Sequence, residues 1–363
     1  MKVAGIICEY NPFHNGHQLH IDKTKEIIKP DVLVCVMSSN FVQRGEPAII
    51  NKWERAKVAI ENGVDLVLEL PFIYSVQSAN HFAYGACEIL KLAQISDICF
   101  GSESNNVEVL KTLASSDINL KKNKGESSAQ AYERLYGKLN ANDILGLNYI
   151  KCLNDTNINI HTIQRTTDYH DKNIKGEISS ATSIREAISK NEQYNKATKM
   201  ILDNTHLMQN YYPLIQMLLL TMKPEELNKI FLMDEGIENM LVKNAKTDDN
   251  FDDFLIHSTS KRYTASSIKR TLTHLMNHTL KEEANNLPSL NYIRVLAYND
   301  KGKTYLKYLK KQGVLIASKF NQIPEPYRSM ELKASFVYAY PLKNKKDFNQ
   351  LELNPPIYVK TSA

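Results

Sequence analysis

The chain has 363 residues, of which 43% are hydrophobic and 23% are charged, and its formal net charge is +5. The length suits two domains with a buried core, and no apolar run is long enough to cross a membrane. The five cysteines include no CxxC pair, which argues against a cysteine-built zinc site, and we expect no bound metal. An apolar strand stands where a signal peptide would be, so we expect a cytoplasmic protein without a membrane partner.

The first predicted element is a strand at Val3–Cys8, followed by a polar turn and a helix. Pro12 forces the chain to turn, and Gly16 removes a side chain where the amides of a helix start point forward. Such a start attracts anions, and His14 and His17 are one helical turn apart, so both imidazoles can flank one phosphate chain. The turn predicts a site for a nucleotide triphosphate, with the imidazoles donating hydrogen bonds; a solvated turn is the alternative.

Strands and helices alternate through the rest of the first half. Strands are predicted at 31–37, 64–70, 97–100 and 159–164, and helices at 51–62, 75–94 and 128–153. This order predicts an α/β fold with a doubly wound, Rossmann-like parallel sheet, which binds ligands at the carboxyl ends of its strands. Arg44 and Gly101 follow such ends and are candidate ligand contacts, although Arg44 also fits a solvated loop. The cations Lys52, Arg55 and Lys57 fit a solvated or a phosphate-facing helix surface equally well.

Further polar residues lie where these segments begin or end. Asn142 is placed either to cap a helix or to contact a base or ribose, and Arg165 ends the fifth strand. The segment 168–171 (Asp-Tyr-His-Asp) lacks a metal-ligand spacing and is interpreted as a loop. In the segment 178–185, hydroxyl side chains lead into a helix, and Arg185 can clasp two phosphate oxygens. A simple Ser/Thr helix cap is the alternative for that segment.

The second half of the chain carries the basic excess. Residues 1–190 contain 21 Lys and Arg against 22 Asp and Glu, whereas residues 191–363 contain 24 against 18. The second half is mainly helical in pattern, apart from a strand at 292–298, so we expect a catalytic domain at 1–190 and a mainly helical, basic domain at 191–363. One basic stretch with an aromatic ring suits RNA phosphates and base stacking, although a solvated helix face fits nearly as well. Its residues are Lys261, Arg262, Tyr263, Lys269 and Arg270.

Two segments of the predicted catalytic domain together resemble the nucleotidyltransferase superfamily with the HxGH signature. They are His14–His17 and the ISSATSIR segment at 178–185, and neither a P-loop nor a KMSKS-like loop is present. Further motifs are similar to those of the bacterial tRNA(Met) cytidine acetate ligase family, which narrows the resemblance. They are EYNPFHNGH at 9–17, QRGEP at 43–47, FGSE at 100–103, NDILG at 142–146 and KRYT at 261–264. Ala141 stands where that family usually has proline, but the following Asn142 is kept.

The resemblance implies a two-step ligase reaction. ATP, with Mg²⁺, and acetate would give acetyl-AMP and pyrophosphate, and N4 of the wobble cytidine of elongator tRNA(Met) would then take the acetyl group. The resemblance also implies catalytic roles for His14 and His17, tRNA binding by the basic stretch, no tightly bound cofactor and no obligatory protein partner. The ATP-binding residues that it implies are Ile7, Cys8, Glu9, Tyr10, Asn11, Pro12, Phe13, Asn15, Gly16, His20, Gly101, Asn142, Arg165, Ser179, Ser180, Thr182 and Arg185.

Two other functions fit parts of the same pattern. An adenylyltransferase that makes a coenzyme precursor would share the chemistry of the site, but it has little need of a basic C-terminal half. A non-catalytic RNA-binding protein could retain a nucleotide pocket, but it would not need His14, Gly16 and His17 together.

Overall fold

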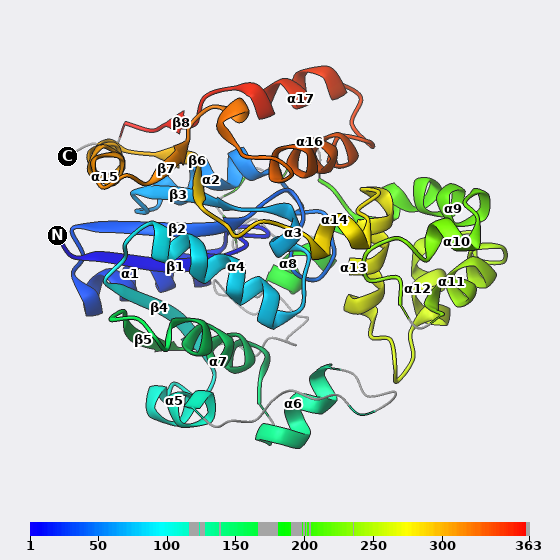
Figure 1. The fold of residues 1–363 in the computed structure, drawn as a ribbon, viewed down its shortest axis with the longest axis horizontal. Coiled ribbons are helices and arrows are strands. Elements are labelled where there is room, and N and C mark those ends of the chain that lie inside the picture. Colours follow the sequence, from blue (N-terminus) through cyan, green and yellow to red (C-terminus); the bar gives the residue numbers. More distant parts are fainter. Residues whose placement is uncertain are drawn as a thin grey trace.

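The computed structural model describes residues 1–115, 123, 128–137, 139–165, 181–189, 198, 200, 202, 205–234 and 236–360. Within these ranges eight strands form one sheet, in which five parallel strands lie in the order β5-β4-β1-β2-β3. The chain starts at the centre and winds outward in both directions, which confirms the predicted doubly wound α/β fold (Figure 1). The five strands are β1 (Val3–Cys8), β2 (Val32–Ser38), β3 (Leu66–Leu70), β4 (Asp97–Ser102) and β5 (Asn159–Gln164).

Helices cover both faces of the sheet. Val34 and Leu68 belong to the core against α4 and α7, whereas Ile6 and Cys35 belong to the core against α1 and α2. Successive side chains of a strand therefore meet apolar surroundings on both sides, which explains the continuous apolar runs in the sequence. These helices and their neighbours are α1 (Asn15–Ile28), α2 (Lys52–Glu61), α3 (Phe72–Ser75), α4 (Ala79–Leu92), α5 (Val107–Ser115), α6 (Ser128–Tyr136), α7 (Ala141–Leu153) and α8 (Ala181–Ser189).

The second half of the chain extends the sheet as well as building helices. β6 (Tyr292–Tyr298), which confirms the strand predicted at 292–298, runs antiparallel to β3. β7 (Leu315–Ala317) and β8 (Ile357–Tyr358) both pair with β6. The helices on this side are α15 (Asp300–Lys311), η2 (Phe320–Gln322), α16 (Tyr327–Tyr338) and α17 (Lys345–Leu353). The sheet thus continues past the boundary expected at residue 190, and the division into two domains stays a prediction.

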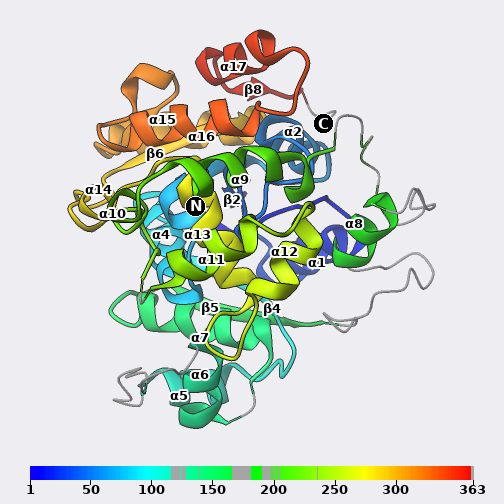
Figure 2. The same ribbon diagram turned by 90° about the vertical axis from the view of Figure 1, so that its right-hand side faces the viewer.

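A group of helices lies beyond the carboxyl ends of β1 to β3, at the right of Figure 1 and in front in Figure 2. Its core also takes in Phe41 and Phe72 from the sheet side, so the two parts share buried surface. The group consists of η1 (Met208–Tyr211), α9 (Tyr212–Thr221), α10 (Pro224–Leu227), α11 (Ile237–Ala245), α12 (Phe251–Ser258), α13 (Ala265–Met276) and α14 (Lys281–Asn285). Among all the described helices, none combines the length and the apolar character that crossing a membrane requires.

Two predicted helices are interrupted in the structure. In the segment 75–94, Ser75 is the last residue of α3 and α4 begins only at Ala79, because Val76 and Ser78 leave helical geometry, with ψ angles of 66° and 160°. The segment 128–153 divides into α6 and α7, and Asn140, with ψ of 166°, is the N-cap of α7. The capping alternative for Asn142 is therefore wrong, since this residue lies inside the first turn of α7.

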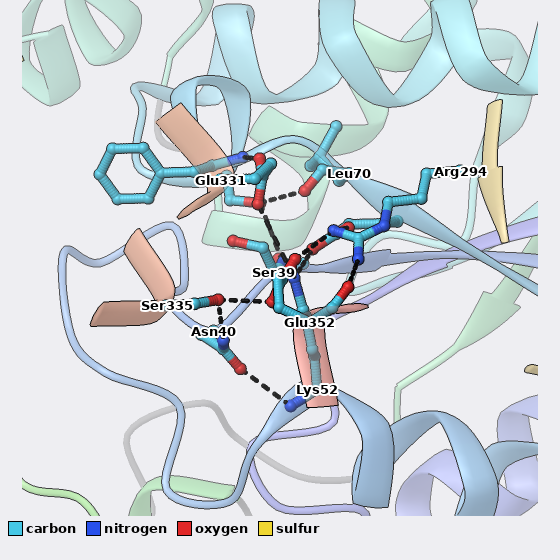
Figure 3. Close-up of polar contacts among 12 residues, drawn as sticks. Ser39, Asn40, Lys52, Leu70, Arg294, Glu331, Ser335 and Glu352 are labelled. Atoms are coloured by element: carbon cyan, nitrogen blue, oxygen red, sulfur yellow. Dashed lines mark hydrogen bonds and ion pairs between the residues drawn. The ribbon is translucent and has the colours of Figure 1, made fainter. Parts of the chain in front are cut away.

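A buried cluster of charges joins the two halves of the chain (Figure 3). Lys52 of α2 contacts Glu69 of β3 at 2.5 Å and Glu352 of α17 at 3.0 Å. Arg294 of β6 contacts the same two carboxylates, at 2.7 and 2.5 Å. The open question about Lys52 is thereby answered, because its side chain faces neither solvent nor a phosphate site but is fully buried in this cluster.

Glu331 of α16 is the third carboxylate of the cluster, which contains two cations. One of its oxygens accepts a hydrogen bond from the Phe72 amide at 2.5 Å, and the other lies 3.9 Å from the ammonium of Lys52. Burial and the charge of Glu69 raise the pKa of Glu331 to about 8. Burial also acts to raise the pKa of Glu352, but Arg294 and Lys52 outweigh it and lower that pKa to about 2. A proton on Glu331 therefore balances two cations against two anions in the interior.

We predict that Glu331→Gln makes the stability of the protein less sensitive to alkali. The folded chain keeps a proton on Glu331 up to about pH 8, whereas the unfolded chain releases it near pH 4.5. The free energy of unfolding therefore falls as pH rises between these values, and the variant lacks this fall. Urea unfolding should be measured at about pH 6 and about pH 8.5. The fall in the free energy of unfolding between these pH values should be at least ~1 kcal/mol smaller in the variant than in the natural protein. Equal losses in both proteins would mean that Glu331 is ionised in the fold.

Candidate active site

Two histidines cap the first turn of α1. His14 is the N-cap, with φ −141° and ψ 171°, and its Nδ1 accepts a hydrogen bond from the Gly16 amide at 3.1 Å. The amide of His14 donates in turn to Nδ1 of His17 at 3.2 Å. The rings are stacked, with centroids 3.7 Å apart. Since both Nδ1 atoms are acceptors, the proton of each neutral ring lies on Nε2, and each imidazole keeps one N–H donor for another partner.

Burial keeps these imidazoles uncharged. It lowers the pKa of His14 to about 3, with Arg165 and Arg185 adding to the effect. The pKa of His17 lies well below its ordinary value, because of burial first and then of His14 and Arg165. Burial likewise lowers the pKa of His20 to about 4. The positive charge of the site therefore comes from the two guanidinium groups, and the imidazoles act as neutral donors.

A buried arginine of α2 fixes the turn between β1 and α1 by hydrogen bonds to backbone carbonyls. Arg55 of α2 is fully buried and donates to backbone carbonyls of Glu9 at 2.6 Å, Ser38 at 3.2 Å and Ile50 at 2.9 Å, and also to that of Ser39. It thus ties the ends of β1 and β2 to the start of α2. Both alternatives for Arg55 in the sequence, a solvated face and a phosphate contact, are wrong. No local pattern distinguishes this arginine, because its partners are carbonyls brought together by the sheet.

The side chains of the turn also make contacts within the protein. The carboxylate of Glu9 accepts a hydrogen bond from the Gln43 amide at 2.7 Å, and Oδ1 of Asn11 accepts one from the Ile49 amide at 2.7 Å. Tyr10 is buried, and its ring centroid lies 4.9 Å from that of His17. These contacts fix the turn to the loop after β2, so the positions of the histidines depend on that loop.

The far end of the predicted catalytic domain reaches this turn. Arg185 of α8 donates to the carbonyl of Asn11 at 2.7 Å and, weakly, to Thr182 at 3.4 Å. Arg165 follows β5, and a Cβ on Gly101 would lie 3.2 Å from its Cγ. Two predicted phosphate contacts, Arg165 and Arg185, therefore lie close to the histidines, as the effects of their charges on His14 also indicate. Ser179 and Ser180 lie outside the described residues.

Asn142 belongs to a polar network at the carboxyl end of β4. Its amide nitrogen donates to Glu103 at 2.5 Å, and the same carboxylate accepts the Asp143 amide at 3.1 Å. Asp143 in turn accepts hydrogen bonds from Ser102 at 2.5 Å and from the Ser104 amide at 3.1 Å. Glu103 and Asp143 belong to the FGSE and NDILG motifs, but neither was among the predicted site residues; for Asp143, an acid in a first helical turn is a usable signal. Among the described residues, no group of three His, Cys, Asp or Glu could hold a metal ion.

The chain is similar to known proteins over most of its length. A family model described as HIGH Nucleotidyl Transferase matches residues 1–352. The tRNA(Met) cytidine acetate ligase of Caldanaerobacter subterraneus subsp. tengcongensis is 38% identical, covering 95% of this chain and 96% of its own. That of Geobacillus sp. (strain WCH70) is 35% identical, covering 93% and 94%. The chain belongs to the tRNA(Met) cytidine acetate ligase family. A crystal structure of Thermotoga maritima TmcAL bound with alpha-thio ATP is 29% identical, with a TM-score of 0.86, and covers 99% of this chain and 100% of its own.

Membership of this family confirms the resemblance, but it leaves the role of each residue to be tested.

The predicted RNA contacts divide into two sets. Lys261 and Arg262 are exposed before α13, and the guanidinium of Arg262 lies 5.3 Å from the centre of the Tyr263 ring. Lys269 and Arg270 are instead partly buried within α13, and burial lowers the pKa of Arg270 to about 10. The first set is exposed and its RNA contact stays a prediction, whereas the second packs against the loop after β2.

We predict that neither His14 nor His17 titrates between about pH 5 and pH 8. Burial disfavours a second ring proton on both, and so do the charges of Arg165 and Arg185 for His14 and of His14 and Arg165 for His17. Long-range ¹H–¹⁵N spectra of histidine-labelled protein should show protonated Nε2 and unprotonated Nδ1 for both rings throughout this range. The same protein unfolded in urea is the control, since its histidines titrate near ~6.5. A midpoint between about pH 5 and pH 8 for either histidine in the folded protein would contradict the neutral pair.

Proposed function

We propose that this protein activates acetate with ATP and transfers the acetyl group to N4 of the wobble cytidine of elongator tRNA(Met). The observation that carries the proposal is the pair of neutral imidazole donors at the start of α1, next to Arg185. The relatives that match most of this chain are named tRNA(Met) cytidine acetate ligases. A structural neighbour holds an ATP analogue.

In the first step, an acetate oxygen attacks the α-phosphorus of ATP, and the bond to the bridging oxygen of pyrophosphate breaks. The products are acetyl-AMP and pyrophosphate. Negative charge grows on phosphate oxygens, so positioning and electrostatic stabilisation supply most of the catalysis. The Nε2–H groups of His14 and His17 would donate to these oxygens, while Arg165 and Arg185 would supply positive charge. Mg²⁺ that arrives with ATP would share the charge of the triphosphate.

In the second step, the exocyclic amine of the cytidine attacks the acetyl carbon, AMP leaves, and the amine loses a proton. The base must leave its stack to reach the site, as a single-stranded anticodon base can. Lys261 and Arg262 would bind RNA phosphates, and Tyr263 would offer a ring for stacking. In this proposal the helical group α9 to α13 binds the tRNA, and the strands and helices of residues 1–190 activate acetate. The protein takes ATP, acetate and tRNA from the cytoplasm.

The test is incubation with ATP, radiolabelled acetate and total tRNA. We expect ATP-dependent label in tRNA, located in N4-acetylcytidine, with no need of acetyl-CoA. Label in a nucleotide coenzyme precursor, or none in tRNA, would refute the ligase proposal and favour an adenylyltransferase. RNA binding without any adenylate would favour a non-catalytic protein.

We predict that a variant of the histidine pair loses acetyl-AMP formation but not tRNA binding, and that a variant of the basic segment shows the reverse. His14→Ala removes a donor to the phosphates and should lower acetyl-AMP formation at least ~100-fold, with tRNA affinity unchanged. The double change Lys261→Gln and Arg262→Gln should weaken tRNA binding at least ~10-fold, mainly at low salt, with acetyl-AMP formation unchanged. Lys301→Gln with Lys307→Gln, two exposed lysines of α15, is the matched control. If both site variants lost only acetyl-AMP formation, this division of roles would be wrong.

A further inference from the structure

The loop after β2 makes its tightest turn where it meets α13. The amide of Gly45 donates to the Val42 carbonyl at 2.8 Å, and the amide of Val42 donates to the Glu46 carbonyl at 2.9 Å. Gly45 has φ of 75°, and a Cβ there would lie 2.2 Å from the backbone nitrogen of Arg270. Oγ1 of Thr273 donates to the Gly45 carbonyl at 2.8 Å. The tip of the loop is therefore seated directly on the backbone of α13 and cannot shift independently of that helix.

The carboxylate of Glu46 is shared between this helix and the candidate active site. One oxygen accepts from the ammonium of Lys269 on α13, and the other lies 3.8 Å from Nε of Arg185 on α8. All three side chains are largely shielded from water, with exposed fractions of 22% for Glu46, 13% for Lys269 and 17% for Arg185. Burial acts to raise the pKa of Glu46, but Lys269 and Arg185 outweigh it and lower that pKa, so the carboxylate stays ionised.

Arg185 is thereby held on two sides. Its NH1 group donates to the carbonyl of Asn11, in the turn that carries the histidines, and its Nε faces Glu46. Its NH2 group also donates weakly to Thr182 at 3.4 Å, and these three contacts together restrict the orientation of the planar guanidinium. Lys269 lies in the helical group, but it is connected to Arg185 of the candidate active site through the carboxylate of Glu46.

We infer that Glu46 is a positioning residue, which lets α13 set the orientation of Arg185 for adenylate formation through Lys269. The inference rests on the proposed function for the identity of the reaction that Arg185 serves. It also connects the segment Lys261–Tyr263, in which Lys261 and Arg262 are exposed, to the site, since Thr264 after it is the N-cap of α13. An RNA bound to that segment would act on the same helix that holds Glu46.

A double-mutant cycle tests this inference. We expect Glu46→Gln to lower kcat of acetate-dependent ATP–pyrophosphate exchange roughly 10-fold, with a smaller change in KM for ATP, because Arg185 is present but no longer fixed. Lys269→Met should lower kcat several-fold in the natural protein and have no further effect in the E46Q background. Lys269→Arg keeps the ion pair and should retain activity within about twofold. Equal losses from Lys269→Met in both backgrounds, or no loss in either, would overturn the inference.

Two further variants separate positioning from charge and from stability. Thr273→Val removes the hydrogen bond to Gly45 without changing any charge, and it should also lower kcat. Glu26→Gln breaks the exposed ion pair with Lys23 and is the matched control, for which no change is expected. Thermal unfolding of each variant shows whether the fold is retained. If Thr273→Val and Glu46→Gln lose stability and keep kcat per folded molecule, the contact is only structural.

Failure of the proposed function is recognised separately. It would appear as absence of acetate-dependent exchange in the natural protein. In that case the same double-mutant cycle is measured with the affinity for ATP, determined by calorimetry, as its readout. Non-additive effects of Glu46→Gln and Lys269→Met on that affinity would still support the link to Arg185, and additive effects would refute it.

Discussion

The hydrogen bonds from the backbone amides of Gly16 and His14 to the Nδ1 atoms of two histidines determine what the site can do. An aspartate at the N-cap would also accept from the Gly16 amide, but an ionised carboxylate has no proton to donate. An imidazole caps the helix with one nitrogen and donates with the other. The N-cap and the third helical position are the two residues of a capping box, which accounts for the spacing of His14 and His17. The backbone thus selects the tautomer before any ligand is present.

This arrangement requires neutral histidines, and the surroundings supply that condition. Two stacked imidazolium rings with centroids 3.7 Å apart would repel each other, and burial adds a desolvation cost. Arg165 and Arg185 carry the positive charge instead, and guanidinium groups keep it at any physiological pH. The site therefore separates two tasks, since the histidines orient hydrogen bonds and the arginines provide charge. A change of pH within the physiological range leaves both tasks intact.

The parts of the structure that depend on local pattern were predictable from the sequence. Apolar runs and helix periodicity predicted the doubly wound sheet, and the HNGH turn predicted paired imidazole donors at a helix start. Contacts between distant segments were not predictable. The strand at 292–298 was expected, but its antiparallel pairing with β3 depends on residues more than two hundred positions apart. Lys52 and Arg55 look alike on one helix, yet one enters a charge cluster and the other binds carbonyls, because only the folded sheet supplies their partners. Glu46 was overlooked for the same reason.

The loop after β2 shows why a contact at its tip can matter for the site. Arg55 binds carbonyls at its start, through Ser38, and at its end, through Ile50. The hydroxyl of Tyr338 donates to the Ala48 carbonyl at 2.7 Å. Both ends of the loop are thus anchored in buried surroundings. Because both ends are anchored, we expect a displacement of α13 against the tip to move the side chain that the tip carries. That side chain is Glu46, and its second oxygen faces the arginine beside the histidine turn.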